Sequence, residues 1–218
     1  METKVKRTHS IESISFYKKI KPEEEELFVL KYKALTKVIP GLVEDFSIDI
    51  NLFKYLIAKN SQNANFCKFY LIQEHDAINF GMTFSNTKTF EVEKEDKLYV
   101  LNSKLFVESN LNDFNKFINN FNSGINSRLI QNINCETKMV YYDLEIVKNY
   151  IDTLELHFKI DNLKFNFIQY SDIDSNGNHL PNYEKINNKI SFSVHANVKD
   201  IYNNTIVSIG YDFGTIYP

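Results

Sequence analysis

The 218-residue sequence has no Trp, two Cys, four Pro and six Gly. The cysteines, Cys67 and Cys135, cannot form the disulfide framework of a small secreted domain, and their spacing excludes a C-x-x-C metal or redox pair. No apolar run approaches the roughly 18 residues that span a bilayer, and no apolar segment follows the polar N-terminus as in a secretory signal. We therefore expect a soluble, cytoplasmic protein that does not bind membranes.

Motifs that identify a reaction are also missing. The sequence contains no G-x-S-x-G, no Walker loop and no G-x-G-x-x-G, so acyl transfer, phosphoryl transfer and dinucleotide binding lack their usual signatures. The formal net charge is −3 and no stripe of lysines is present, which argues against nucleic-acid binding. We expect no catalytic residues and no cofactor other than a candidate calcium ion, although dispersed catalytic residues leave enzymatic activity open.

Charge distribution and helical periodicity predict two helices early in the chain. Pro22 begins the first helix, with glutamates at 23–26 and lysines toward its end, which complements the helix dipole. Asp49 is placed to cap the second helix with its carboxylate. The apolar face of that helix contains Leu52, Phe53, Leu56 and Ile57.

Strands are predicted after these helices. Residues 66–73 are mostly apolar, and residues 78–84 alternate between apolar and other side chains, as expected of a half-buried strand. Two further strands are expected at 89–93 and 98–107.

The second half of the chain shows a similar order of elements. An Asn-rich helix begins near Leu111 and is expected to break at Gly124, and Asp143 is placed to cap another helix. Strands are predicted at 138–142, 163–170, 190–196 and 205–211.

The two halves also match residue by residue, which indicates an internal repeat. The match places Asp49 on Asp143 and Lys68 on Lys164. Convergent patterning of two amphipathic units is the alternative, because a chain rich in Phe, Ile and Lys matches itself easily. The aligned segments are 47–57 with 141–151, 68–73 with 164–169, and 78–80 with 190–192.

These observations predict an α+β fold made of two tandem, duplicated units. Each unit is expected to contain two amphipathic helices and an antiparallel sheet of two to four strands. Residues 1–20 are expected to form an N-terminal arm or strand, 21–109 the first unit and 110–218 the second. The two units are short enough that each needs the other to complete its core, so they are compatible with one globular body.

One loop resembles part of a calcium site in its residue spacing. Asp172, Asp174 and Asn176 stand at positions 1, 3 and 5 of a D-x-D-x-N-G pattern, in which oxygen ligands converge on one point. Tyr183 occupies the twelfth position, where a calcium loop has Glu, and His179 is a candidate extra ligand. The same residue types also favour an ordinary turn.

Aromatic residues are abundant, with 18 Phe and 13 Tyr. One explanation is a core in which Phe and Tyr take the place of Trp and Leu. The other is an exposed interaction surface, since Tyr is enriched at protein interfaces. The candidate interaction residues are Tyr141, Tyr170, Tyr202 and Tyr211.

The function that these features favour is a non-enzymatic protein–protein interaction or assembly protein, with a protein partner or a second copy of itself. The predicted strand at 205–211 offers a sheet edge for such a partner. The alternative is a small-ligand or metal-ion binding protein, or a hydrolase. Its site would lie between the two halves and use Asp172, Asp174 and His179.

Overall fold

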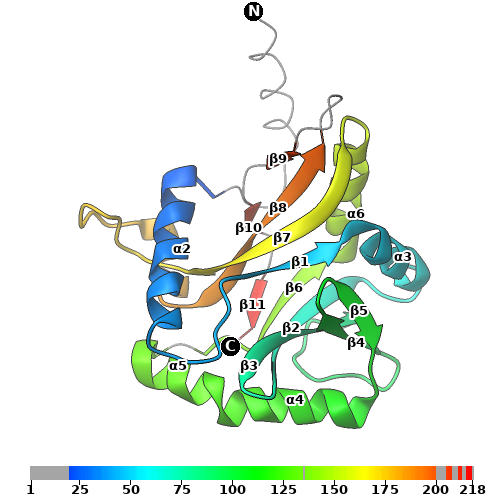
Figure 1. The fold of residues 1–218 in the computed structure, drawn as a ribbon, viewed down its shortest axis with the longest axis horizontal. Coiled ribbons are helices and arrows are strands. Elements are labelled where there is room, and N and C mark those ends of the chain that lie inside the picture. Colours follow the sequence, from blue (N-terminus) through cyan, green and yellow to red (C-terminus); the bar gives the residue numbers. More distant parts are fainter. Residues whose placement is uncertain (1–19, 135, 200–204, 208–210, 213–214, 218) are drawn as a thin grey trace, which may run out of the picture.

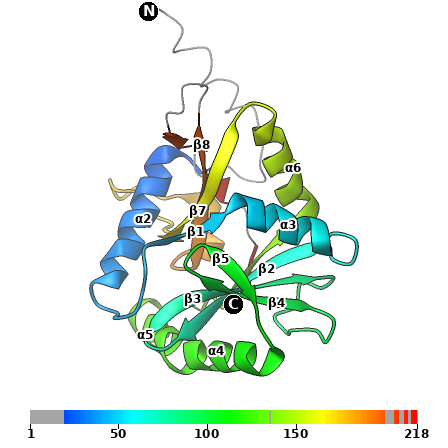
Figure 2. The ribbon, with the colours of Figure 1, turned by 45° about the vertical axis from the view of Figure 1, so that its right-hand side comes forward.

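A computed structural model (Figure 1) describes residues 20–134, 136–199, 205–207, 211–212 and 215–217, and describes side chains as far as Lys199. Two antiparallel sheets face each other in it, with helices on their outer faces and ends (Figures 1 and 2). This confirms a mixed fold of helices and antiparallel sheets. No helix in the described part of the chain is both long and apolar enough to cross a membrane.

Each sheet has its own order of strands. Sheet A has the order β1 (Asp45–Asp49), β7 (Lys159–Gln169), β8 (Ile190–Lys199), with β9 (Thr205–Val207) and β10 (Tyr211–Asp212) both paired to β8. Sheet B has the order β11 (Thr215–Tyr217), β6 (Met139–Asp143), β2 (Phe66–Glu74), β3 (Ala77–Ser85), β4 (Lys97–Asn102), β5 (Leu105–Glu108).

Strands of the two halves of the sequence pair with each other in both sheets. β1 belongs to the first half and pairs with β7, placing Ser47 opposite Lys164. β6 belongs to the second half and pairs with β2, placing Tyr141 opposite Lys68. Strand pairing therefore crosses the expected boundary between residues 109 and 110 in both sheets.

The hairpins β2–β3 and β7–β8 have corresponding registers. Gln73 lies opposite Ile78 in the first hairpin, and Gln169 lies opposite Ile190 in the second. These are positions that the sequence alignment of the two halves places on each other.

The two predicted aspartate caps are confirmed. The Asp49 carboxylate accepts a hydrogen bond from the backbone N–H of Leu52 at 2.9 Å, at the start of α3 (Ile50–Asn60). The Asp143 carboxylate accepts from the N–H of Glu145 at 3.0 Å, at the start of α6 (Leu144–Glu155). Each cap thus turns a strand directly into a helix, and the two helices lie together at one end of the sheets (Figure 2).

The other helices cover the outer faces of the sheets. α2 (Pro22–Thr36) packs on β7 of sheet A, and α4 (Leu111–Ser123) packs on β2 of sheet B. Gly81 of β3 allows this close approach, because a Cβ atom there would lie 2.5 Å from Cζ of Phe114. The chain then turns at Gly124, as predicted, into α5 (Ile125–Ile133).

Aromatic rings fill the space between the sheets. Phe46 of β1 stacks on Phe80 of sheet B with ring centroids 3.5 Å apart, and on Phe165 of sheet A at 4.7 Å. Phe167 and Phe192 contact the same group of rings. The aromatic excess in the sequence is thus accounted for largely by a core that joins the two sheets.

Two strand predictions were wrong in detail. Residues 89–93 form part of a loop rather than a strand, and Tyr70 holds this loop by donating its hydroxyl hydrogen to the carbonyl of Phe90. Residues 98–107 form the hairpin β4–β5, which turns at Ser103 with φ 58°. Of the strand expected at 205–211, residues 205–207 form β9 and Tyr211 begins β10, and both pair with β8; residues 208–210 lie outside the described residues.

Candidate functional site

The predicted calcium loop projects beside α2, away from the junction between the sheets (Figure 1). One oxygen of Asp174 accepts hydrogen bonds from the backbone N–H groups of Asn176 and Asn178, at 2.8 and 2.7 Å. The other oxygen accepts from the side-chain amide of Asn178 at 2.9 Å. These hydrogen bonds, that of the Asn178 side chain above all, lower the pKa of Asp174. Its carboxylate therefore stabilises the turn.

Asp172 and His179 make contacts at the base of the same loop. The carbonyl of Asp172 accepts the N–H of Leu180 at 2.6 Å. His179 lies 2.5 Å from Glu184, and this hydrogen bond raises the pKa of the imidazole. In the part of the chain that the structure describes, no three His, Cys, Asp or Glu residues form a group that could hold a metal ion. Calcium binding by Asp172, Asp174 and Asn176 stays a prediction.

The four candidate tyrosines have different environments. Tyr170 is only 1% exposed and packs against Phe28 and Tyr183 beneath α2, so its expected role as a surface contact is corrected. Tyr141 is half-buried on the outer face of sheet B, where Lys88 Nζ lies 5.8 Å from its ring centroid. Tyr202 and the side chain of Tyr211 lie outside the described residues.

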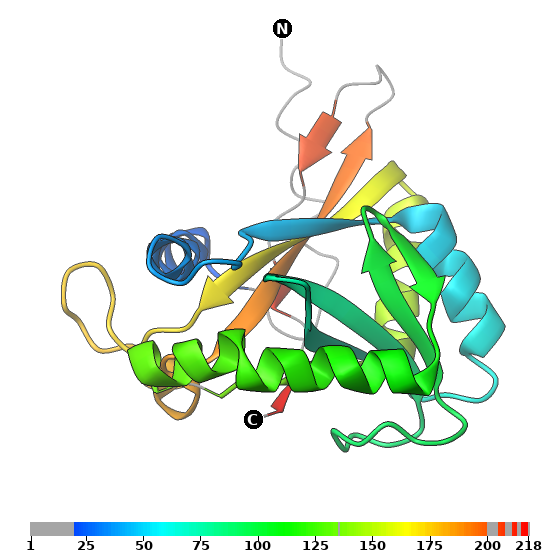
Figure 3. The same ribbon diagram turned by 60° about the horizontal axis from the view of Figure 1, so that its bottom comes forward.

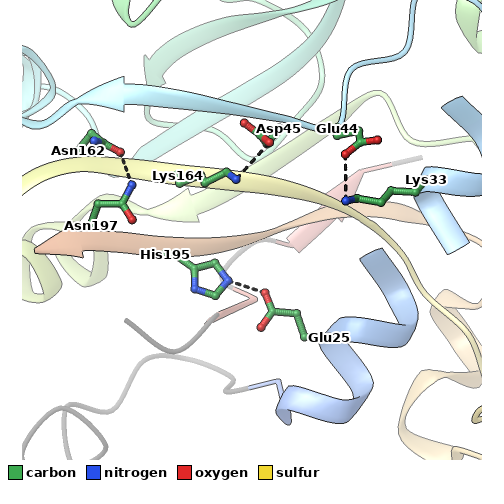
Figure 4. A network of polar contacts seen from close by, with 8 residues as sticks. All are labelled: Glu25, Lys33, Glu44, Asp45, Asn162, Lys164, His195 and Asn197. Atoms are coloured by element: carbon green, nitrogen blue, oxygen red, sulfur yellow. Dashed lines mark hydrogen bonds and ion pairs between the residues drawn. The ribbon is translucent and has the colours of Figure 1, made fainter. Parts of the chain in front are cut away.

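The outer face of sheet A carries polar side chains that pair across neighbouring strands (Figure 4). Lys164 Nζ of β7 lies 3.2 Å from Asp45 Oδ2 of β1. Asn197 of β8 donates to Asn162 of β7 at 2.8 Å. These groups use one another as partners, which is typical of a structural polar face.

A second group of contacts joins α2 to this face. His195 of β8 lies 2.5 Å from Glu25, and Lys33 lies 3.0 Å from Glu44 (Figure 4). Burial opposes ionisation of Glu25, but the hydrogen bond and charge of His195, aided by Ser193, lower its pKa below 4.5. Ser193 is fully buried, so this group lacks the accessible hydroxyl of a hydrolase nucleophile. The contact between Glu25 and His195 holds α2 on sheet A.

Lys68, the counterpart of Lys164 in the alignment, is buried beneath the loop of residues 86–96. Its ammonium group donates to the Thr87 hydroxyl at 3.3 Å. Burial lowers the pKa of Lys68, and the negative charges of Asp96 and its neighbours in the loop partly offset this effect. The lysine thus ties the loop to sheet B.

A small cavity lies between the two sheets. It has a volume of about 20 Å³ and lies among Phe53, Phe69, Phe165 and other core side chains. This volume holds about one water molecule. Asp172, Asp174 and His179, which the alternative hypothesis assigns to a ligand site, do not line this cavity.

A larger groove lies on the outer face of sheet B, between the β4–β5 hairpin and α4. Figure 3 shows that α4 begins beneath this hairpin. The volume of the groove is about 450 Å³. Val100 of β4 and Val107 of β5 contribute apolar surface, and Phe117 of α4 contributes an aromatic side chain. The lining comprises Glu74, Asn79, Val100, Leu101, Asn102, Ser103, Val107, Glu108, Ser109, Asp113 and Phe117.

The groove is acidic and continues into exposed apolar surface. Glu74, Glu108 and Asp113 line it, and no Lys, Arg or His does. Next to it in the chain, Leu105 is 50% exposed and Leu111 is 44% exposed. Leu105 lies on the same face of the hairpin as Val107, because side chains two apart in a strand point the same way.

Sequence reasoning missed this groove. The prediction of one strand over residues 98–107 concealed the hairpin, so Leu105 and Val107 were not placed beside the start of α4. One signal in the sequence could have indicated the hairpin. The polar residues Ser103 and Lys104 interrupt the apolar pattern of that segment, as a turn does.

Comparisons with known proteins add no assignment: no protein-family model, no curated protein and no solved structure matches this chain.

Proposed function

We propose that this chain is a non-enzymatic protein-binding or assembly protein that binds its partner in the groove between α4 and the β4–β5 hairpin. The observation that carries this proposal is a groove in which Val100, Val107 and Phe117 add apolar surface among polar side chains. Leu105 and Leu111, which neighbour its lining residues in the chain, are about half exposed. Apolar surface bordered by polar groups is typical of sites where another protein docks.

The other surfaces described support the choice of this face. The polar side chains of sheet A pair with one another, and the acidic loop at Asp174 uses its carboxylate internally. At the groove, by contrast, Leu105 and Val107 are each about half exposed, at 50% and 52%. Covering them releases water from apolar surface, which is the main favourable term in protein association.

The experiment compares two aspartate substitutions at exposed apolar positions, one in the groove and one outside it. Val107→Asp places a charge in the groove, whereas Leu156→Asp places one after α6, away from the groove, at a residue that is 77% exposed. Sedimentation velocity of the purified chain measures self-association, and quantitative affinity capture from cell extract measures binding of other proteins. Equal thermal midpoints establish that both variants fold.

We expect Val107→Asp to weaken at least one association by about thirtyfold, equivalent to about 2 kcal/mol at an interface hot spot. Leu156→Asp should leave that association unchanged. A chain that is monomeric and captures no protein contradicts the proposal, and so does an association that both variants retain.

We also infer that the chain arose by duplication of a β-α-β-β unit, represented by residues 45–85 and 139–199. The supporting observation is that positions aligned by sequence occupy corresponding registers in both sheets. In this interpretation the first strand of each unit is exchanged into the sheet of the other. Such an exchange is the arrangement expected of two fused copies of a strand-swapped dimer.

A further inference from the structure

The groove has a chemistry that favours a basic segment containing some apolar residues. Val100 and Val107 contribute apolar surface to the groove, and its lining carries three carboxylates without a cationic side chain. A ligand that matches both features needs Lys or Arg to face the carboxylates and apolar side chains to cover the apolar surface.

The N-terminal segment of this same chain has that composition. Residues 1–19, which lie outside the described residues, contain five Lys or Arg against two Glu. The basic residues gather in Lys4-Val5-Lys6-Arg7 and at Lys18-Lys19, and Ile11, Ile14 and Phe16 provide apolar side chains between them.

Residues 1–19 join the fold on the side of sheet A. Ile20, the first described residue, is buried against α2 in a cluster with Phe28 and Ile168. α2 covers the outer face of sheet A, whereas the groove lies on the outer face of sheet B (Figures 1 and 2). An extended segment of 19 residues reaches about 65 Å at most. Ile20 and the groove thus lie on opposite outer faces of the two sheets, and the reach of the segment is long enough for it to leave its own copy.

We propose that residues 1–19 of one copy bind in the groove of a second copy, and that reciprocal exchange of these segments forms a homodimer. This inference rests on the proposed function, because it names the occupant of the same groove. Reciprocal exchange is self-complementary and closes at two copies. Attraction between the basic segment and the acidic groove makes the dimer weaker at high salt.

Charge reversal on the full-length chain tests this proposal. One variant carries Lys4→Glu, Lys6→Glu and Arg7→Glu, and the other carries Glu74→Lys and Glu108→Lys in the groove. We expect each variant alone to self-associate about tenfold more weakly than the unmodified chain in sedimentation velocity. A mixture of the two variants should regain a one-to-one complex, because reversed segment and reversed groove then attract each other.

The matched control reverses two exposed acids outside the groove, Glu95→Lys and Asp152→Lys, and should dimerise normally. If the segment variant dimerises like the unmodified chain while Val107→Asp does not, residues 1–19 are not the occupant and the groove still binds a partner. If the mixture fails to form a complex, the proposed pairing is wrong. If the unmodified chain is monomeric at all concentrations, the exchange is refuted, and affinity capture with Val107→Asp then decides the proposed function separately.

Discussion

Phe46 is the residue whose removal most directly tests whether the two sheets share one core. It lies on β1, a five-residue strand at the edge of sheet A, and is 8% exposed. Its ring contacts Phe80 of sheet B as well as Phe165 and Phe192 of sheet A. Phe46→Ala therefore removes a contact between the sheets without touching a charge or a hydrogen bond of the side chain.

The expected loss of unfolding free energy follows from this environment. Replacing a buried Phe by Ala costs about 3–5 kcal/mol, which combines lost transfer free energy with the cavity that remains. Stacking on neighbouring rings adds about 0.5–1.5 kcal/mol per aromatic pair beyond area burial, but these terms overlap. We expect about 3–5 kcal/mol, a large part of the roughly 5–15 kcal/mol that stabilises a typical domain.

Urea denaturation followed by far-ultraviolet circular dichroism and by tyrosine fluorescence measures this loss; the chain has no Trp to interfere. Tyr55→Ala is the control, because Tyr55 lies on α3 and is 59% exposed, and it should change stability by no more than about 0.5 kcal/mol. Both probes should report one transition in Phe46→Ala. A loss below about 1 kcal/mol, or two separate transitions, would refute a core shared by both sheets.

Two further predictions concern the contact of α2 and the division of the chain. Because the pKa of Glu25 is lowered in the fold, its stabilising effect is complete above its unfolded value near 4.5 and is lost as the pH falls through the folded value. Glu25→Gln should therefore reduce the thermal midpoint at pH 6 to 7 but not in strong acid, and a difference independent of pH contradicts the contact with His195. Fragments 1–109 and 110–218 should each fail to fold alone, because β1 and β6 each pair with strands of the other fragment. When the fragments are mixed, the circular dichroism of helix and sheet should return. Independent folding of either fragment counts against the exchange of β1 and β6 between the two units.

Local signals in the sequence predicted where α2, α3 and α6 begin. Pro22 with the following glutamates fixed the start of α2, and Asp49 and Asp143 fixed the starts of α3 and α6 through hydrogen bonds to residues two or three positions away. Such contacts depend only on neighbouring residues, so they can be recognised without knowing the fold.

Long-range pairing was harder to predict. β1 has only five residues, so no local pattern marks this segment as a strand. Its Phe46 pairs with Phe165 of β7, which lies more than 100 positions away along the chain. Tyr170 was expected at the surface because Tyr is enriched at protein interfaces. The position of α2 over β7 decides that it is buried.

The candidate site depended on tertiary structure in the same way. Asp172 and Asp174 have the residue types of both a calcium loop and a turn, and only the hydrogen bonds of Asp174 show how the loop uses that carboxylate. The groove needs Val107 of a hairpin and Phe117 of a helix to meet, which no spacing in the sequence indicates.

Amide hydrogen–deuterium exchange tests the proposed docking surface most directly. It compares the full-length chain bound to its partner or second copy with the same chain unbound. Our proposal predicts slower exchange in β5 and in the first turn of α4, from Leu105 to Asp113, on association. It predicts no change at Asn162, Lys164 and Asn197 on the polar face of sheet A. Protection of that polar face with unchanged exchange from Leu105 to Asp113 would contradict the proposal.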